Sequence, residues 1–491
     1  MSPRRGIAVV VAVVLALAGL GLASRHEPVV APSTFASLGR PTMPFVPTGS
    51  FITSSWFCPG VPAGEADVGG SVTIANPTDE AMTGTVTAFT TSPGDSSTGA
   101  PIPAPSTVRD ITVDPRSTTT VDLLEMQPTG SFVSAVVEIN GGGGFVEQVA
   151  RHPAGDAVAA CANAASSDWY FADGFTVDGS TEQLVLTNPY PDAAIVDIGF
   201  VTSDGVRRPS RLQGYPVPGR SVQVVELGAR DEPVVAAEVV ASRGRVVAGR
   251  SQHYLGGGRL GYSMTLGAPS LTTQAWFADG ERGEGITERY SIYNPTGEDI
   301  VVYPVFLGAP VSAEFTNDRE ITVPKGRVVT FDTADEPNLP AGRHGIVFST
   351  FATSADLDVP SMVVERVITR PAGNSVATSV VMGAPPELAS RRWSAAISTD
   401  VALEDAIVVL NADNIPTTVT VSTLGTGGLV PVPGLEDLPL GAGSVITIPI
   451  TDPSAFGVPF VVTSEQSLFV ERLLPRGADL RGRSGSYALA G

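Results

Sequence analysis

The feature that most constrains this chain is a repeated tryptophan motif. Trp169 opens the segment WYFADG, Trp276 opens WFADG, Trp56 opens the looser WFCPG, and Trp393 opens a divergent fourth copy. The spacings are 169 − 56 = 113, 276 − 169 = 107 and 393 − 276 = 117 residues. A fixed period of this size is the signature of a repeat protein, so we predict one unit of roughly 110 residues present four times.

The repeats divide the chain into six segments. An apolar segment at 1–23 is followed by a linker rich in Pro, Ser and Thr at 24–50. We expect that linker to be extended and to act as a spacer. The repeats are then expected at 51–165, 166–272, 273–389 and 390–491, the last being the most divergent.

The pattern inside each repeat predicts short strands. Val72 and Ile74 alternate with polar residues ahead of Asn76-Pro77, and the same Asn-Pro pair follows apolar runs at Asn188 and Asn294. Alternation is typical of a half-buried strand, and proline ends a strand because it lacks the N–H donor. In repeat 4 the residue after Asn411 is alanine instead.

Seven or so strands per 110 residues favour an immunoglobulin-like sandwich. We therefore predict an all-β fold of four tandem immunoglobulin-like β-sandwich repeats after an N-terminal apolar helix. The alternative is a β-propeller, in which each repeat would supply two blades. Within repeat 1, residues 132–139 and 144–150 flank three glycines and are predicted to form a hairpin.

The N-terminus indicates export. Arg4 and Arg5 precede an uncharged apolar run at residues 7–23, which is typical of a secretory signal peptide or an uncleaved transmembrane anchor. Both alternatives stay open. We expect the rest of the chain to be extracytoplasmic, either secreted or held at the membrane by residues 7–23 alone.

The two cysteines suit that compartment. Cys58 lies in the first strand of repeat 1 and Cys161 lies in its last strand. First and last strands of one sandwich can be neighbours, and disulfides persist in oxidising surroundings. We predict a Cys58–Cys161 disulfide, with two buried thiols as the alternative.

Charge and motif content point away from several functions. The formal net charge is −20, which argues against nucleic acid as a partner because phosphate is also negative. The histidines have no partners at metal-ligand spacing, so we expect no metal site; they are His26, His152, His253 and His344. No nucleophile elbow, phosphate loop or dinucleotide fingerprint is present, so we expect no cofactor, no catalytic residue and no enzymatic activity.

A second recurring pattern places a glutamate near the end of each repeat. Glu365-Arg366 and Glu471-Arg472 are consecutive pairs, Glu147 stands in the same place, and repeat 2 has Ala248 there with His253 five residues on. Consecutive strand residues point to opposite faces. We expect these acidic and basic residues to pair across neighbouring strands rather than to form one site.

Aromatic residues leave a binding function open. Tryptophans at one place in each repeat are expected to be core anchors, namely Trp56, Trp169, Trp276 and Trp393. A glycan-binding protein would instead need exposed rings, for which the candidates are Tyr215, Tyr254, Tyr262 and Tyr303. A hydrolase would need a carboxylate cluster at an interface between repeats.

The segment from Trp169 to Gly174, with Asn188-Pro189 and the turn 217–220, resembles repeats in uncharacterised secreted proteins of actinobacteria, which form a family of unknown function. The resemblance implies an extracytoplasmic β protein of the cell envelope and assigns no catalytic residue. We therefore expect a non-enzymatic envelope scaffold or interaction module. Its partners would be envelope proteins or cell-wall glycans, with polysaccharide binding as the alternative and a hydrolase as the less favoured one.

Overall fold

The computed structural model describes residues 41–47, 53–91, 105–309, 318–351, 359–425, 427–476 and 481–491. Their regular secondary structure is nearly all antiparallel β-sheet, which confirms the predicted all-β class. The expected apolar helix at 7–23 lies outside the described residues. Within the described ranges no helix has the length and apolar character needed to cross a bilayer.

Repeat 1 contains two sheets. Its elements are β1 (Thr53–Phe57), β2 (Val61–Pro62), β3 (Gly69–Asn76), β4 (Met82–Thr90), β5 (Thr107–Val113), β6 (Ser117–Asp122), α2 (Leu123–Met126), β7 (Phe132–Asn140), β8 (Phe145–Arg151) and β9 (Ala157–Ala160). One sheet has the order β1-β7-β4-β5 with β2 beside β7, and the other has the order β6-β3-β8-β9.

Repeat 2 has the same two-sheet plan. Its elements are β10 (Asp168–Phe171), η1 (Val177–Gly179), β11 (Thr181–Asn188), β12 (Ala194–Thr202), β13 (Gly205–Arg207), η2 (Ser210–Leu212), β14 (Tyr215–Val217), β15 (Ser221–Glu226), β16 (Ala236–Arg243), β17 (Val247–Gly256) and β18 (Arg259–Leu266). The sheets run β10-β16-β12-β13, with β14 beside β12, and β15-β11-β17-β18.

Repeat 3 follows the plan again. Its elements are β19 (Gln274–Arg282), β20 (Thr287–Asn294), β21 (Ile300–Leu307), β22 (Ile321–Val323), β23 (Arg327–Asp332), η3 (Thr333–Asp335), β24 (Gly342–Thr350), β25 (Val363–Ala372) and β26 (Ser375–Met382). The sheets run β19-β24-β21-β22 and β23-β20-β25-β26.

Repeat 4 departs from the plan in one respect. Its elements, with the short η4 before them, are η4 (Pro386–Leu388), β27 (Ser390–Ala395), β28 (Leu403–Asn411), β29 (Thr417–Gly425), β30 (Gly428–Pro431), β31 (Leu438–Leu440), β32 (Val445–Ile450), η5 (Pro453–Ala455), β33 (Phe460–Arg476), β34 (Gly482–Tyr487) and β35 (Leu489–Ala490). β33 pairs with β27 and β29 through its first half and with β28 and β34 through its second half. One long strand therefore joins what are separate sheets in the other repeats.

The two sheets of a repeat share one apolar core. In repeat 3, Phe277 and Phe348 from one sheet pack with Ile292 and Val364 from the other. Each is fully buried or nearly so, and burial of such a side chain stabilises the fold by about 1.5–3 kcal/mol.

The predicted hairpin in repeat 1 is wrong. β7 pairs with β1 and β4, whereas β8 pairs with β3 and β9. The three glycines therefore carry the chain from one sheet to the other. Near its end each repeat does form a hairpin, namely β8–β9, β17–β18, β25–β26 and β33–β34.

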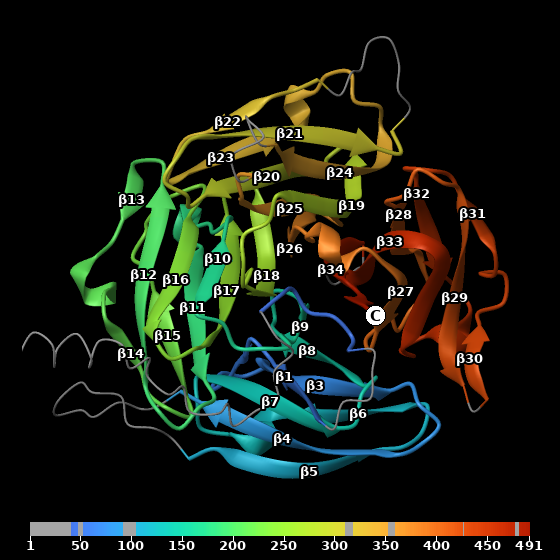
Figure 1. The fold of residues 1–491 in the computed structure, drawn as a ribbon, viewed down its shortest axis with the longest axis horizontal. Coiled ribbons are helices and arrows are strands. Elements are labelled where there is room, and N and C mark those ends of the chain that lie inside the picture. The colour runs from blue at the N-terminus through green and yellow to red at the C-terminus, as the bar shows by residue number, and fades with distance from the viewer. Residues whose placement is uncertain are drawn as a thin grey trace, which may run out of the picture. The chain divides into compact units, whose positions relative to one another are not determined.

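The four repeats meet around a centre, within the compact unit Ser37–Gly491. The last strand of each hairpin contacts its neighbours in turn: β9 contacts β18, β18 contacts β26, β26 contacts β34, and β34 contacts β9. Figure 1 shows these strands toward the middle, with repeat 1 in blue and repeat 4 in red beside one another. The repeats are thus joined in a closed circuit rather than only end to end.

Part of the expected linker packs on this circuit. The Phe45 backbone N–H donates to Asn163 Oδ1 of repeat 1 at 2.9 Å, and Val46 N–H donates to the carbonyl oxygen of Ala490 in repeat 4 at 2.6 Å. Residues 41–47 therefore bridge the first and last repeats and are not a free spacer. The remainder of the expected linker, 24–40 and 48–50, lies outside the described residues.

A buried asparagine braces every repeat at the end of one strand. The Asn188 Nδ2 group donates to the carbonyl oxygens of Asp192 and Val217 at 2.8 and 3.0 Å, and its Oδ1 accepts from Tyr190 N–H at 3.0 Å. Asn76, Asn294 and Asn411 make the corresponding bonds. Asn411 makes these hydrogen bonds although the residue after it is alanine rather than proline. The asparagine, and not the proline, is therefore the residue that this position requires.

We expect Asn188→Ala to lower the free energy of unfolding by about 2–4 kcal/mol, because it removes three hydrogen bonds and leaves buried carbonyls unpaired. Pro189→Ala should cost less than about 1 kcal/mol. Urea unfolding of both variants measures the difference. Equal losses would show that proline contributes as much as asparagine, and would contradict the conclusion that asparagine is the required residue.

Candidate functional site

The most distinctive polar site is repeated at the interfaces between repeats. At the interface of repeats 2 and 3, Arg250 on β17 pairs with Glu365 on β25 through two contacts of 2.8 Å. The backbone N–H groups of Ala172 and Asp173 each donate to Glu365 Oε2 at 2.7 Å. We call this arrangement a clamp: a glutamate of one repeat held by an arginine and two backbone N–H groups of its neighbour.

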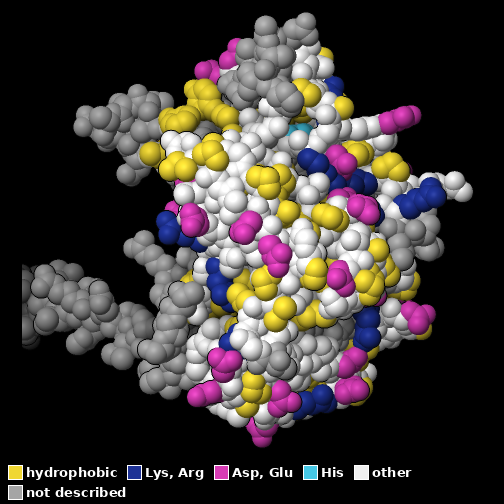
Figure 2. All heavy atoms as spheres, turned by 90° about the vertical axis from the view of Figure 1, so that its right-hand side faces the viewer, with side chains coloured by type: hydrophobic (Ala, Val, Ile, Leu, Met, Phe, Trp, Pro, Cys, Tyr) yellow, Lys and Arg dark blue, Asp and Glu magenta, His cyan; other side chains and the backbone are white. Residues whose placement is uncertain are grey.

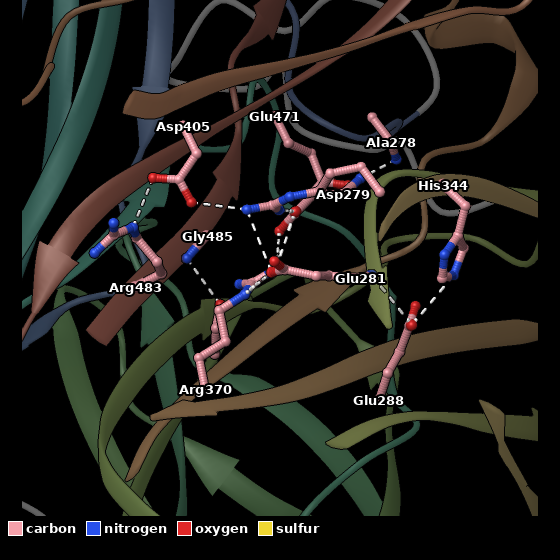
Figure 3. Close-up of polar contacts among 12 residues, drawn as sticks. Ala278, Asp279, Glu281, Glu288, His344, Arg370, Asp405, Glu471, Arg483 and Gly485 are labelled. Carbon is pink, nitrogen blue, oxygen red and sulfur yellow. Dashed lines mark hydrogen bonds and ion pairs between the residues drawn. The ribbon is translucent and has the colours of Figure 1, made fainter. Parts of the chain in front are cut away.

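The same clamp joins repeats 3 and 4. Arg366 contacts the two carboxylate oxygens of Glu471 at 3.0 and 2.7 Å. Ala278 N–H and Asp279 N–H donate to Glu471 Oε1 at 2.8 and 3.1 Å. Figure 3 shows Glu471 above the Asp279 side chain in this interface.

A third clamp closes the circuit between repeats 4 and 1. Arg472 contacts Glu147 at 2.7 and 2.6 Å, although 325 residues separate them. Ala396 N–H and Ile397 N–H donate to Glu147 Oε2 at 2.8 and 3.0 Å. The chain therefore returns to its first repeat with the chemistry that joins the others.

Strand geometry explains the directions of the pairs. Glu365 and Arg366 are consecutive, so they point to opposite faces of β25. Glu365 reaches back to repeat 2 and Arg366 reaches forward to Glu471 of repeat 4. The expectation of pairing between neighbouring strands of one sheet is therefore wrong, because the partners belong to different repeats.

The interface between repeats 1 and 2 lacks the charged pair. The strand registers place Gln148 where the other repeats have arginine, and Gly249 where they have glutamate. Ala248 is the residue expected at the glutamate position, with His253 at the position five residues later. Both expectations are wrong by one residue, since Gly249 holds the glutamate position. Gln148 bonds Gly60 of its own repeat through Nε2 and Oε1, at 2.5 and 2.8 Å.

Close packing replaces the clamp at this interface. A Cβ atom on Gly249 would lie 2.7 Å from Pro59 Cβ and 3.0 Å from Pro59 O, so the position accepts no side chain without movement. Cys58, the residue before Pro59, forms the predicted disulfide with Cys161. The covalent bond therefore lies beside the interface at which the described residues form no clamp.

The glycine of the FADG motif also has a packing reason. A Cβ on Gly174 would lie 2.2 Å from Glu182 Oε2, and one on Gly280 would lie 2.5 Å from the His344 ring. Glu182 is fully buried, its two oxygens have no hydrogen-bond partner among the described residues, and burial raises its pKa to about 8. It is therefore protonated at neutral pH.

At the corresponding place in repeat 3, Glu288 has partners. His344 Nε2 lies 3.2 Å from Glu288 Oε2, and Tyr290 O–H donates to the other oxygen. Burial alone would raise the pKa of Glu288, but His344 and Tyr290 outweigh burial and lower it. Two equivalent glutamates therefore differ in charge because only one has partners.

A carboxylate cluster does lie at an interface, between repeats 3 and 4 (Figure 3). Asp279 contacts Arg370 at 3.0 Å and also pairs with Arg343. Asp405 contacts Arg343 at 2.7 Å and Arg483 at 2.8 Å. Each of these carboxylates is thus engaged by guanidinium groups, which is typical of a structural ion-pair network.

The tryptophans occupy two kinds of position. Trp56, Trp169 and Trp393 are fully buried, and the indole N–H groups of Trp169 and Trp393 donate to backbone carbonyls at 2.9 Å. In repeat 3 the position of these buried tryptophans is filled by Ala275. Trp276 is the next residue, and its ring stacks on Phe469 of repeat 4 with the ring centroids 5.1 Å apart. Aligning the tryptophans therefore shifts repeat 3 by one residue; the FADG segments give the true register.

The other candidate residues are scattered. Tyr254 and Tyr262 are buried, whereas Tyr215 and Tyr303 are half-buried on different repeats. His152 stacks on Tyr262 at 4.3 Å and meets the edge of His253 at 4.7 Å. Over the described ranges, no group of three or more His, Cys, Asp or Glu could hold a metal ion, and His26 lies outside those ranges.

One family model matches part of the chain. Residues 152–258 match the model of a family described as "Family of unknown function (DUF5719)". No curated protein is found to be similar. The matched range covers the last strand of repeat 1 and repeat 2 up to the end of β17, without β18. It supports the resemblance over that part of the chain; the actinobacterial origin and the repeat motif stay predictions.

Two solved structures show weak similarity. A Thermotoga maritima protein, "Crystal Structure of Thermotoga maritima 1070", is 19% identical over 22% of this chain and 96% of its own, with a TM-score of 0.19. "Biofilm associated protein - BSP domain" is 9% identical over 93% of this chain and 98% of its own, with a TM-score of 0.13. Both TM-scores are too low for either structure to support an argument.

We expect Glu182 to make stability depend on pH. Its pKa is raised from 4.5 to about 8 in the folded protein. The protonated side chain therefore contributes fully to the free energy of unfolding below about pH 4.5, and this contribution is lost as the pH rises toward about 8. Glu182→Gln removes this term. As the pH rises from about 4.5 to about 8, the free energy of unfolding of the variant should therefore increase by on the order of 4 kcal/mol relative to that of the unmodified protein.

Urea unfolding across this pH range measures that gain. Glu284→Gln, at an exposed position, is the matched control and should show no such trend. A constant difference between Glu182→Gln and the unmodified protein would mean that Glu182 is ionised throughout.

Proposed function

We propose that this protein is a non-enzymatic scaffold or interaction module of the cell envelope, built from four immunoglobulin-like sandwiches closed into a ring. The observation that carries the proposal is the clamp between Glu147 and Arg472, which links the last repeat to the first. A closed ring keeps its outer surfaces at fixed spacings, which suits a protein that arranges partners.

The use of the buried charges supports a structural role. Catalytic carboxylates need a free proton or lone pair in an accessible site, whereas Glu147, Glu365 and Glu471 each accept two backbone N–H groups and an arginine. The cluster around Asp279 is similarly engaged by guanidinium groups. The hydrolase alternative would require such groups to be released.

Export is part of the proposal. The apolar run at residues 7–23 suits a signal peptide or anchor, and a disulfide is expected to persist only in an oxidising compartment. Figure 2 shows acidic and basic side chains interspersed on the face that it presents, without a large patch of one sign. Such a surface suits specific contacts better than general attraction to a polyanion.

One observation favours polysaccharide binding as a second candidate. The rings of Tyr303 and Phe351 lie 5.5 Å apart, and Phe351 is 60% exposed. An aromatic pair with one exposed ring offers a flat apolar surface on which a sugar ring could stack.

The test is retention of envelope fractions by the immobilised full chain. We expect saturable retention of specific envelope proteins, with loss of retention in Glu147→Ala, which opens the ring, but not in Glu80→Ala, at an exposed position of the same repeat. Retention of a polysaccharide that disappears in Phe351→Ala would favour the second candidate. Depolymerisation of any fraction, or no retention at all, would contradict the scaffold proposal.

A further inference from the structure

A pocket lies where the hairpins of all four repeats converge. Ala154 from repeat 1, residues 253–255 and 260–261 from repeat 2, residues 372–377 from repeat 3, and Arg476 with Arg481 from repeat 4 line it. The cavity is about 740 Å³ and is open on one side. We call it the axial pocket; its size is in the range of small-molecule sites.

The lining of the axial pocket has an unusual charge. It includes Arg476, Arg481 and His253 but, among the described residues, no aspartate or glutamate. The chain as a whole has 50 acidic and 30 basic residues. The described lining of this pocket therefore differs from the chain as a whole, in which acidic residues are in excess. A lining with arginines and no carboxylate favours an anionic ligand.

Arg476 is the central group of the pocket. It is only 5% exposed, and its guanidinium donates to the carbonyl oxygens of Thr378 at 2.5 Å, Asp156 at 2.7 Å, and Tyr262. These three carbonyls belong to repeats 3, 1 and 2, so Arg476 of repeat 4 contacts every other repeat. The carbonyls fix the plane of the guanidinium, which is part of the lining of the pocket.

Among the described residues Arg476 has no carboxylate in direct contact, although the charge of Asp156 offsets in part the lowering of its pKa by burial. Arg370 has the same place in repeat 3 and pairs with Asp279 and Glu281, whereas Arg476 forms no ion pair with a carboxylate in the described ranges. Burial lowers the pKa of Arg476 to about 10, so it remains charged at neutral pH. Of its five N–H groups, three have acceptors, and Nε has none among the described residues.

A buried cation without a counter-ion is costly, and a bound oxyanion would offset that cost. The walls beside Arg476 include Leu260 and Val376, and their exclusion of water would strengthen the attraction. We propose that the axial pocket binds an oxyanion, carried as a carboxylate or phosphate by a small solute. The proposal goes beyond the scaffold function and does not depend on it.

Calorimetric titration of the full chain tests the proposal with three probes: inorganic phosphate, glucuronate, and glucose as the neutral control. We expect saturable binding of one or both anions with Kd in about the millimolar range, and no binding of glucose. Preference between the two anions distinguishes a phosphate from a carboxylate ligand. Binding of glucose as tight as that of glucuronate would overturn the proposal.

Two variants locate the binding. Asn374→Asp adds a negative charge at the exposed rim of the pocket and should weaken anion binding at least about five-fold. Asn414→Asp makes the same change at an exposed turn of repeat 4 outside the pocket and should leave binding unchanged. Equal weakening in both variants, or no saturable binding by the unmodified chain, would contradict the proposal.

Arg476→Gln should abolish binding. If its fold is retained and the anion still binds, Arg476 is not the ligand-binding group and the proposal fails. If this variant does not fold, the comparison of Asn374→Asp with Asn414→Asp still decides the question, because both substitutions are at exposed residues and make the same change of charge.

Discussion

The structure depends on one buried interaction, the clamp that holds a glutamate of one repeat with an arginine and two backbone N–H groups of its neighbour. A buried ion pair adds little net stability over apolar packing, since desolvation of both charges opposes their attraction. Loss of one partner is different, because it leaves an unpaired charge in the interior. The clamps therefore contribute mainly to specificity, because a repeat packs stably only against a neighbour that presents the complementary group.

That condition explains how the order of repeats is specified. Glu365 faces Arg250 and Arg366 faces Glu471, so β25 presents a negative charge to the repeat before it and a positive charge to the repeat after it. β33 does the same with Glu471 and Arg472. Repeat 1 presents only Glu147 and repeat 2 presents only Arg250. The neutral interface between them, with Gln148 and Gly249, thus marks where the circuit starts and excludes a shift of the repeats by one place.

Much of the fold could be predicted from local sequence. The period of the motif indicated a β-rich repeat, alternation at residues such as Val72 and Ile74 indicated strands, and Cys58 and Cys161 were paired correctly from their places in the first and last strands. The hairpin prediction failed because the glycines at 141–143 permit a crossing between sheets as readily as a turn within one. Trp276 gave a register that is wrong by one residue. The core position that tryptophan fills in the other repeats is filled by Ala275 in repeat 3, and Trp276 is the next residue.

The clamps could not be predicted from local sequence. Glu147 and Arg472 are 325 residues apart, and nothing in the residues near either one indicates its partner. The recurrence of Glu-Arg at 365–366 and 471–472 was the available signal. It becomes interpretable only when the repeats are known to close, since the opposite directions of the two side chains then require partners in two different repeats.

The most direct test of this account is a double-mutant cycle on Glu147 and Arg472, measured by urea unfolding of the full chain. A closed circuit predicts a coupling free energy on the order of 2–4 kcal/mol between Glu147→Ala and Arg472→Ala. Repeats joined only end to end would keep these residues apart, and the two losses would then add within about 0.5 kcal/mol. That additive result would contradict the closed circuit and the account built on it.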